Sequence, residues 1–408
     1  MRRPPSIVTL LSTLLVVVAI FGAGSALAAT AGDDPGTPHA VTTENDTVGR
    51  LTVPDGAATG ESATADLSSA LSGQQERLQS TLQTGQFRSA FESARNESAK
   101  SAVIDATLDR LEARAMTLRD QRQTAIQSFT RDEMTSSELF RELARIRIAS
   151  EEINQQVAVL ETVVQESSVV SLSDDATATL AAIDGEVITL QGPITARLTA
   201  SLRGIAPPRS IGVISSESGA VLTAIDGGTF LREATLWSER LDSGANQFEQ
   251  GDTAPLSRAY QQVQGAYPWA VENLVSGLSV TGFGESTVYA VELTHSHGDL
   301  QTYLDGRTTN VFYEVQQLQL SSLPTGTVAA NTTDGVLLEV NATAVGPSAV
   351  TVRNATTGKR VIAEITVETA TRNRATIGSR LWLLETDETR TITARRPDGT
   401  TVAVTVGS

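Results

Sequence analysis

Cysteine is absent from all 408 residues of this chain. Its absence excludes disulfides, zinc–thiolate sites, iron–sulfur clusters and cysteine nucleophiles. Lysine is almost absent as well, because Lys100 and Lys359 are the only two lysines among 31 basic residues. The sequence also has neither a P-loop nor a Gly-x-Gly-x-x-Gly turn, the motifs that hold nucleotide phosphates on backbone N–H groups. We therefore expect no cofactor.

Positive charge is scarce overall, and the formal net charge is −16. Proteins that bind nucleic acids cluster Lys and Arg on one surface, so we expect no nucleic-acid partner. The acidic excess lies mainly in residues 169–323, which hold 17 acidic residues against 7 arginines. Low lysine, high Asp and Glu, and abundant Ala, Thr and Val resemble the composition of halophilic archaeal proteins. There, a strongly hydrated acidic surface keeps a protein soluble in salt.

The N-terminus has the pattern of an export signal in residues 1–28. Arg2 and Arg3 precede an apolar run over residues 7–21, and small residues follow up to an Ala-x-Ala site that ends at Ala28. A retained signal anchor is the alternative, with membrane contact through residues 7–28, because this run is almost long enough to span a bilayer. No later segment is apolar enough to span, so we expect an exported protein, extracellular or anchored at the cell surface.

Residues 29–62 are rich in Gly, Thr, Asp and Pro, which predicts a disordered acidic linker. Asn-x-Ser/Thr sequons account for five of the ten asparagines. Such sites accept glycans on the surfaces of exported proteins, so we expect a glycoprotein, although a Thr-rich composition alone would also raise their number. The candidate glycosylation sites are Asn45, Asn96, Asn331, Asn341 and Asn354.

Heptad-spaced apolar residues predict a coiled-coil-like helical hairpin or bundle over residues 63–168. The spacing gives a first helix over 66–84 that ends at Gly85, and a second over 86–129. The leucines Leu67, Leu71, Leu78 and Leu82 fall on one face of the first helix.

A third helix begins at a capping box made by Thr135 and Glu138. Its apolar stripe over residues 139–164 is wide, which favours an antiparallel bundle. The alternative is a coiled coil through which two copies of the chain associate.

The middle segment, residues 169–323, predicts an α+β domain. Strands are expected over 186–190, 211–214, 220–225, 286–295, 300–304 and 309–320, and a helix over 256–274 that Pro268 interrupts. The strand pattern over residues 289–314, with turns at Gly298-Asp299 and Asp305-Gly306, resembles PepSY-type domains. The resemblance implies a role in extracytoplasmic protease inhibition or sensing. Residues 219–227 echo the pattern, which indicates two related halves.

Residues 324–408 predict a small immunoglobulin-like β-sandwich, because six strand candidates recur about every ten residues. The hairpin over 352–367, with Gly358 at its turn, and the later Trp382 resemble the carboxypeptidase-regulatory-like family. That resemblance implies an adhesion or spacer role on the cell surface. The predicted fold class is therefore a multidomain α and β protein: a long-helix bundle, an α+β domain and a β-sandwich.

Histidine chemistry is confined to one strand end. His295 and His297 alternate, so both imidazoles point to one face, and Asp299 follows them. They are the candidate metal ligands, although a closed site needs further ligands and the third histidine, His39, lies in the linker. A Ser-His-Asp hydrolase would also need a Gly-x-Ser-x-Gly elbow, which the sequence lacks.

An aromatic cluster is the remaining candidate site, and it holds two of the three tryptophans. An aromatic-lined binding pocket and the core of an aromatic-poor domain both explain it. The cluster contains Phe230, Arg232, Glu233, Trp237 and Arg240 beside Tyr267, Pro268 and Trp269.

These patterns favour an exported, non-catalytic binding or scaffolding protein of the cell surface. Its partner would be another protein, an envelope component or a second copy of the chain. The first alternative is a regulator of extracytoplasmic proteolysis, on the PepSY-like strands. The second is a secreted hydrolase.

Overall fold

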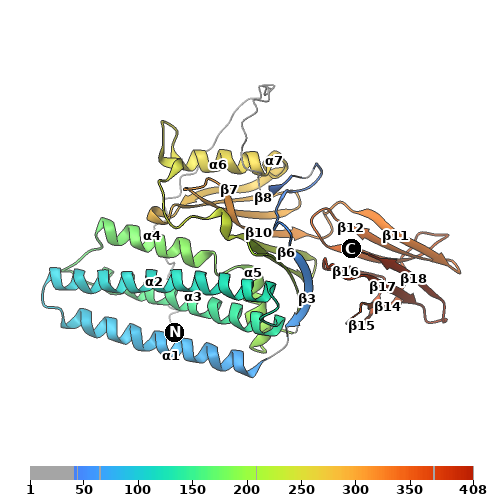
Figure 1. The fold of residues 1–408 in the computed structure, drawn as a ribbon, viewed down its shortest axis with the longest axis horizontal. Helices are drawn as coiled ribbons and strands as arrows, with labels where there is room; N and C mark the ends of the chain where they lie inside the picture. Colours follow the sequence, from blue (N-terminus) through green and yellow to red (C-terminus); the bar gives the residue numbers. More distant parts are fainter. Residues whose placement is uncertain (1–40, 44, 64–65, 208, 371–372, 408) are drawn as a thin grey trace, which may run out of the picture.

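A computed structural model describes residues 41–43, 45–63, 66–207, 209–370 and 373–407 (Figure 1). The export signal predicted for residues 1–28 lies outside these residues. Within them, no helix has the length and the apolar character that a membrane span requires. The helices are α1 (Leu67–Ser93), α2 (Glu97–Thr130), α3 (Ser136–Gln165), α4 (Asp174–Ile188), α5 (Pro193–Leu202), α6 (Pro255–Ala266) and α7 (Pro268–Glu272).

An eight-stranded antiparallel sheet lies at the centre, in the order β3-β4-β5-β6-β10-β9-β8-β7. Four strands on each side form a meander, and the two meanders meet where β6 pairs with β10. The strands are β3 (Ala57–Ala63), β4 (Arg209–Ser215), β5 (Gly219–Asp226), β6 (Thr229–Leu236), β7 (Leu274–Gly282), β8 (Val288–His295), β9 (Gly298–Asp305) and β10 (Val311–Gln319).

The long helices cover one face of this sheet and the short helices α6 and α7 cover the other (Figure 1). Apolar side chains of α2, α3 and α5 form one core with β3, β4, β5 and β6. A second core lies within the bundle itself, between α1, α2, α3 and α4. The helices are therefore packed on the sheet and do not stand apart from it as a stalk.

The first helix differs from its prediction in length and in orientation. Gly85 does not end α1, which continues to Ser93, where Phe87 and Phe91 are buried. A glycine inside a helix costs about 1 kcal/mol relative to alanine, which the packing of two phenylalanines outweighs. Leu78 and Leu82 are 67% and 69% exposed, so the leucine face predicted for the core points to solvent at these positions.

The caps of α2 and α3 explain where these helices begin. Asn96 is the N-cap of α2, and its Oδ1 accepts a hydrogen bond from the backbone N–H of Ala99 at 2.8 Å. The capping box predicted at Thr135 and Glu138 is confirmed, with both reciprocal hydrogen bonds present. Hydrogen bonds from the backbone and the side chain of Thr135 to the Glu138 carboxylate lower the pKa of Glu138.

Residues 186–190 are not a strand, as the sequence pattern predicted, because most of them belong to α4. Ser173 caps this helix, and Asp174 and Asp175 lie in its first turn, where the helix dipole favours negative charge. Val187 packs in the core of the bundle, and Ile188 packs against side chains of the sheet. Pro193 then occupies the first turn of α5, where a missing N–H costs nothing.

The prediction of a disordered linker is wrong for residues 41–63. These residues form β1 (Val41–Thr42), β2 (Arg50–Leu51) and the edge strand β3 of the large sheet. Val48 and Leu51 are fully buried against the face that α6 and α7 cover. The polar composition concealed these contacts because most of the stabilising groups belong to the sheet and not to the segment.

A buried ion pair fastens this N-terminal segment to the centre of the sheet. Arg232 of β6 pairs with Glu314 of β10, and their side chains are 4% and 0% exposed. Glu314 Oε2 accepts hydrogen bonds from the N–H of Leu51 at 2.7 Å and from the Tyr267 hydroxyl at 2.6 Å, while Arg232 donates to the Leu51 carbonyl. Both backbone groups of Leu51 are thereby satisfied by one ion pair.

The C-terminal part is a sandwich of two four-stranded sheets, ordered β11-β12-β13-β16 and β15-β14-β17-β18. The fold class predicted from the sequence, including the terminal β-sandwich, is confirmed. Two of its strands, β11 and β15, were not among the six expected. The strands are β11 (Gly326–Thr333), β12 (Val336–Ala342), β13 (Ser348–Asn354), β14 (Ala363–Glu368), β15 (Asn373–Gly378), β16 (Arg380–Leu383), β17 (Arg390–Arg395) and β18 (Thr401–Val406).

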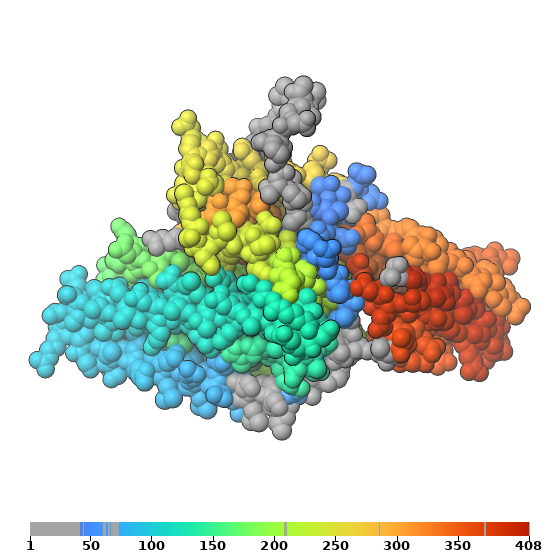
Figure 2. Space-filling view, viewed as in Figure 1, coloured from blue at the N-terminus to red at the C-terminus, as the bar shows by residue number. Residues whose placement is uncertain are grey.

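The sandwich extends from one side of the molecule and is docked on the sheet domain (Figure 2). Val345, Trp382 and Leu384 pack into the core that contains Val48 and Leu51. Asp387 Oδ2 accepts a hydrogen bond from the N–H of Ala58 on β3 at 2.6 Å. The N-terminal segment therefore lies between the sheet and the sandwich and contacts both.

We predict that Glu314→Gln lowers the free energy of unfolding by about 3–5 kcal/mol, because it leaves Arg232 as a buried, unpaired charge. Chemical denaturation followed by tryptophan fluorescence measures the change. Arg131→Gln is the control, since its ion pair with Glu217 is exposed and contributes nothing measurable. Equal unfolding free energies for the two variants would show that the buried pair does not fasten the fold.

Candidate functional site

A cavity of about 230 Å³ lies where the bundle meets the sheet. Its wall comes from α2, from the segment between α4 and α5, from β6 with the 3₁₀ turn η1 (Trp237–Glu239), and from β10. The apolar part of the lining consists of Ile126, Leu190, Trp237 and Phe312. The polar part is dominated by three arginines, Arg119, Arg122 and Arg240. We call this space the arginine cavity.

Two of the three arginines are paired with carboxylates. Arg240 pairs with Glu186 of α4, and its guanidinium carbon lies 4.8 Å from the centre of the Phe312 ring. Arg119 contacts Asp242 at 2.9 Å and Asp120 at 3.1 Å, with Glu186 at 3.9 Å. These pairs hold two guanidinium groups in the wall.

The third arginine, Arg122, has no carboxylate partner among the described residues. It is 7% exposed, and its Nη1 donates to the Thr189 carbonyl at 2.9 Å. Its Nε is buried without a hydrogen-bond partner from the described part of the chain, and so is Thr235 Oγ1. Buried donors in folded proteins are nearly always satisfied by protein groups, by water or by a ligand, so these two atoms mark a place where a bound molecule can form hydrogen bonds.

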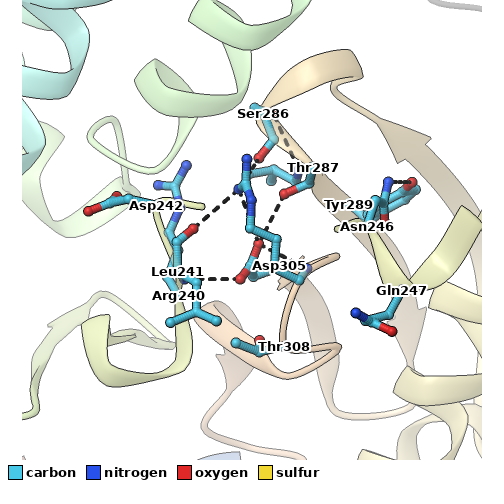
Figure 3. A network of polar contacts seen from close by, with 12 residues as sticks. Arg240, Leu241, Asp242, Asn246, Gln247, Ser286, Thr287, Tyr289, Asp305 and Thr308 are labelled. Atoms are coloured by element: carbon cyan, nitrogen blue, oxygen red, sulfur yellow. Dashed lines mark hydrogen bonds and ion pairs between the residues drawn. The ribbon is translucent and has the colours of Figure 1, made fainter. Parts of the chain in front are cut away.

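The buried aspartate Asp305 fixes the loop that carries Arg240 and Asp242 (Figure 3). Asp305 accepts hydrogen bonds from the N–H of Leu241 at 3.0 Å and from the Thr287 hydroxyl at 3.1 Å. Arg307 donates from Nη1 to the carbonyls of Leu241 and Ser286, both at 3.2 Å. The wall of the cavity is thus held by contacts that do not enter it.

Glu233 fixes the cavity from the sheet side. It is fully buried on β6, and its Oε1 accepts a hydrogen bond from the N–H of Ile194 at the start of α5. Burial raises the pKa of Glu233, and the charge of Arg122 opposes the rise. A side chain at Gly192 would clash with this carboxylate, because an added Cβ would lie 2.2 Å from its carbon. Glycine is required there for the helix end to approach the sheet.

The predicted aromatic cluster is divided by the sheet. Trp237 and Arg240 line the arginine cavity. Phe230, Arg232 and Tyr267 lie on the opposite face with the buried ion pair. The cluster is therefore partly a cavity wall and partly core, and Glu233 is a structural carboxylate behind the cavity.

The candidate metal ligands do not converge on one point. The ring centres of His295 and His297 are 6.3 Å apart. The ring centre of Trp269 lies 5.5 Å from that of His295 and 4.5 Å from that of His297. His297 Nδ1 is 3.0 Å from Thr47 Oγ1, whereas Asp299 accepts a hydrogen bond from Thr294. No group of three or more metal-ligating side chains occurs in the described ranges. The pair instead joins the N-terminal segment to α7.

The candidate glycosylation sites lie at the surface or at element ends. Asn45 and Asn331 are exposed, and Asn341 and Asn354 are half-buried on strands of the sandwich. Asn331 Nδ2 donates to the Ala403 carbonyl at 2.7 Å, and Asn96 uses its Oδ1 as the α2 cap. The atom that accepts a glycan is Nδ2, so this hydrogen bond of Asn331 must break before a glycan is attached there.

Sequence patterns did not find Arg119, Arg122, Thr235 or Phe312 as site residues. The first two appeared as ordinary helix-surface charges, because α2 carries arginines along much of its length. The one signal in the sequence is that Arg122 stands between Leu118 and Ala125 in the heptad-spaced stripe, where an apolar residue is expected. Only the packing of α2 on β6 and β10 brings these groups together.

Three family models match the chain. Residues 1–206 match a domain of unknown function (DUF7096), residues 211–324 a family of unknown function (DUF7094), and residues 327–403 an archaeal fibronectin-III type-like domain. No curated protein and no solved structure matches. The first two matched regions share one sheet, because β3 pairs with β4, so they form a single physical unit.

We predict that wild type exceeds His295→Gln in unfolding free energy at pH 7. This difference should shrink as the pH falls from about 7 to 4. Burial lowers the pKa of His295 from 6.5 to about 4, so between these values the unfolded chain binds the proton more readily. Burial raises the pKa of Asp184 to about 6, which acts in the opposite direction but cancels between the two proteins.

Denaturation curves at half-unit pH steps measure this difference. His297→Gln is the matched control, because that ring is less buried and its pKa falls less far. A wild-type advantage over His295→Gln that does not change with pH would refute the assignment of a neutral, buried His295.

Proposed function

The chain belongs to the family of the domain of unknown function DUF7096, and from this premise we propose that it is an exported, non-catalytic binding and scaffolding protein of the cell surface. The observation that carries the proposal is the arginine cavity. Its buried side-chain atoms without a hydrogen-bond partner in the described part of the chain are the Nε atoms of Arg122 and Arg240 and the Oγ1 of Thr235.

Guanidinium groups favour binding over catalysis. Arginine keeps its proton at all physiological pH values, so it binds acceptors but does not serve as a general acid or base. The carboxylates near the cavity, Glu186 and Asp242, are already paired with arginines. A cavity with these groups can recognise a ligand through charge and shape.

The C-terminal sandwich supports an extracellular setting, since it matches an archaeal fibronectin-III type-like domain. The apolar N-terminal run, the acidic composition and the five sequons agree with this setting. The docked sandwich and the fastened N-terminal segment give a rigid body, which suits a protein that presents a binding site at a surface.

Self-association through α1 is the proposed partner contact. Leu78 and Leu82 lie one turn apart on α1 and face solvent, and a second copy of the chain would cover them.

A regulator of extracytoplasmic proteolysis is the alternative, on the antiparallel strands β8, β9 and β10 that gave the PepSY resemblance. A secreted hydrolase ranks third. Loss of a measured hydrolytic turnover on changing His295 or His297 would favour the hydrolase over the binding protein.

We predict that the native protein is found outside the cytoplasm and co-purifies with an envelope component or with itself. Protease protection of whole cells, followed by affinity capture from membrane fractions, tests both parts. A native N-terminus at Ala29 would indicate a cleaved signal, and a retained Met1 an anchor. A cytoplasmic location would contradict the proposal, and capture of a protease would favour the alternative. Leu78→Glu with Leu82→Glu should abolish capture of a second copy.

A further inference from the structure

We propose that the arginine cavity binds a small monocarboxylate that carries a compact apolar group. This inference rests on the proposed binding function and names the ligand class of the same cavity. The carboxylate lies on the free edge of Arg122 and accepts a second hydrogen bond from Thr235, and the apolar group lies against Leu190, Trp237 and Phe312.

The hydrogen-bonding groups define the acceptor. Arg122 uses Nη1 for the Thr189 carbonyl, which leaves the edge that bears Nε and Nη2. Two parallel N–H donors on one edge of a guanidinium match the two oxygens of a carboxylate. Thr235 Oγ1 is a third donor, on the β6 face that carries Glu233.

The charge defines the ligand as a monoanion. Arg240 is paired with Glu186, and Arg119 with Asp242 and Asp120, whereas no carboxylate of the described residues lies within ion-pair distance of Arg122, whose charge acts on Glu233. Asp120 and Asp242 also line the cavity, but they are 65% and 73% exposed, so water weakens the effect of their charge there. Burial disfavours the charged form of Glu233, and its Oε1 already caps α5. A buried, uncompensated guanidinium is costly unless an anion pairs with it.

The size and the walls define the rest of the molecule. A volume of about 230 Å³ accommodates a small organic acid. Aromatic and aliphatic walls favour an apolar group over a polyhydroxylated one. A branched aliphatic acid of about five carbons, or benzoate, fits both constraints.

The test is direct binding to the full-length folded protein by isothermal titration and by the shift in thermal midpoint. The probes are isovalerate and benzoate, with the neutral amides isovaleramide and benzamide, inorganic phosphate and acetate. We expect the two larger carboxylates to bind, and the amides, phosphate and acetate to bind about tenfold more weakly or not at all.

Three variants locate the binding. Arg122→Lys keeps the charge but removes the two-pronged edge, and should weaken benzoate binding by about tenfold or more. Thr235→Val keeps the shape of a side chain whose hydroxyl makes no other contact, and should weaken it about threefold without loss of folding. Arg396→Gln, in the turn between β17 and β18 of the sandwich, should leave it unchanged, because no residue of the sandwich lines the cavity.

Absence of binding by both larger carboxylates would overturn the inference, as would equal binding of the amides, or affinities that both cavity variants leave unchanged. Preferential binding of phosphate would also overturn it. If the carboxylates fail while the protein still captures its envelope partner, this ligand assignment is wrong and the proposed function stands. If capture fails as well, both are wrong.

Discussion

The ion pair between Arg232 and Glu314 is the interaction on which the rest of the structure depends. It joins β6 to β10 at the line where the two meanders meet, and its remaining hydrogen-bonding atoms hold Leu51 and Tyr267. A buried pair is weak evidence for net stability, but the removal of one partner is strongly destabilising. Its effect is therefore to specify one arrangement: the N-terminal segment must cross this face, and the helix pair α6–α7 must cover it.

The opposite face of the same two strands carries the cavity. Glu233 and Thr235 alternate with Arg232 along β6, so one strand supplies the fastening residue to one side and the cavity residues to the other. Glu233 positions the start of α5, and Asp305 positions the loop that carries Arg240. Two buried carboxylates thus hold two separate segments of the cavity wall in place, and the donors of Arg122 and Thr235 lack a partner in the described part of the chain.

Much of the architecture could be predicted because local signals carried it. The capping box at Thr135, the strands around residues 211–225 and the β-sandwich follow from caps, alternation and turns. The failures share a cause: contacts between distant residues decided the outcome. The segment 41–63 is held by Arg232 and Glu314. Helix α1 continues past Gly85 because Phe87 and Phe91 pack on the bundle. Val187 is buried in a helix and not in a strand. Trp237 and Arg240 were found from composition, but Arg122 and Thr235 could not be found without the packing of α2 on the sheet.

The most direct measurement is the NMR resonance of the Arg122 side-chain Nε–H in ¹⁵N-arginine-labelled protein, assigned by its absence from Arg122→Lys. The account predicts that benzoate moves this resonance downfield as the free donor gains a charged acceptor, and that benzamide leaves it in place. An Arg122 resonance that does not respond to saturating benzoate, or that responds equally to the amide, would contradict the assignment of the arginine cavity as a carboxylate site.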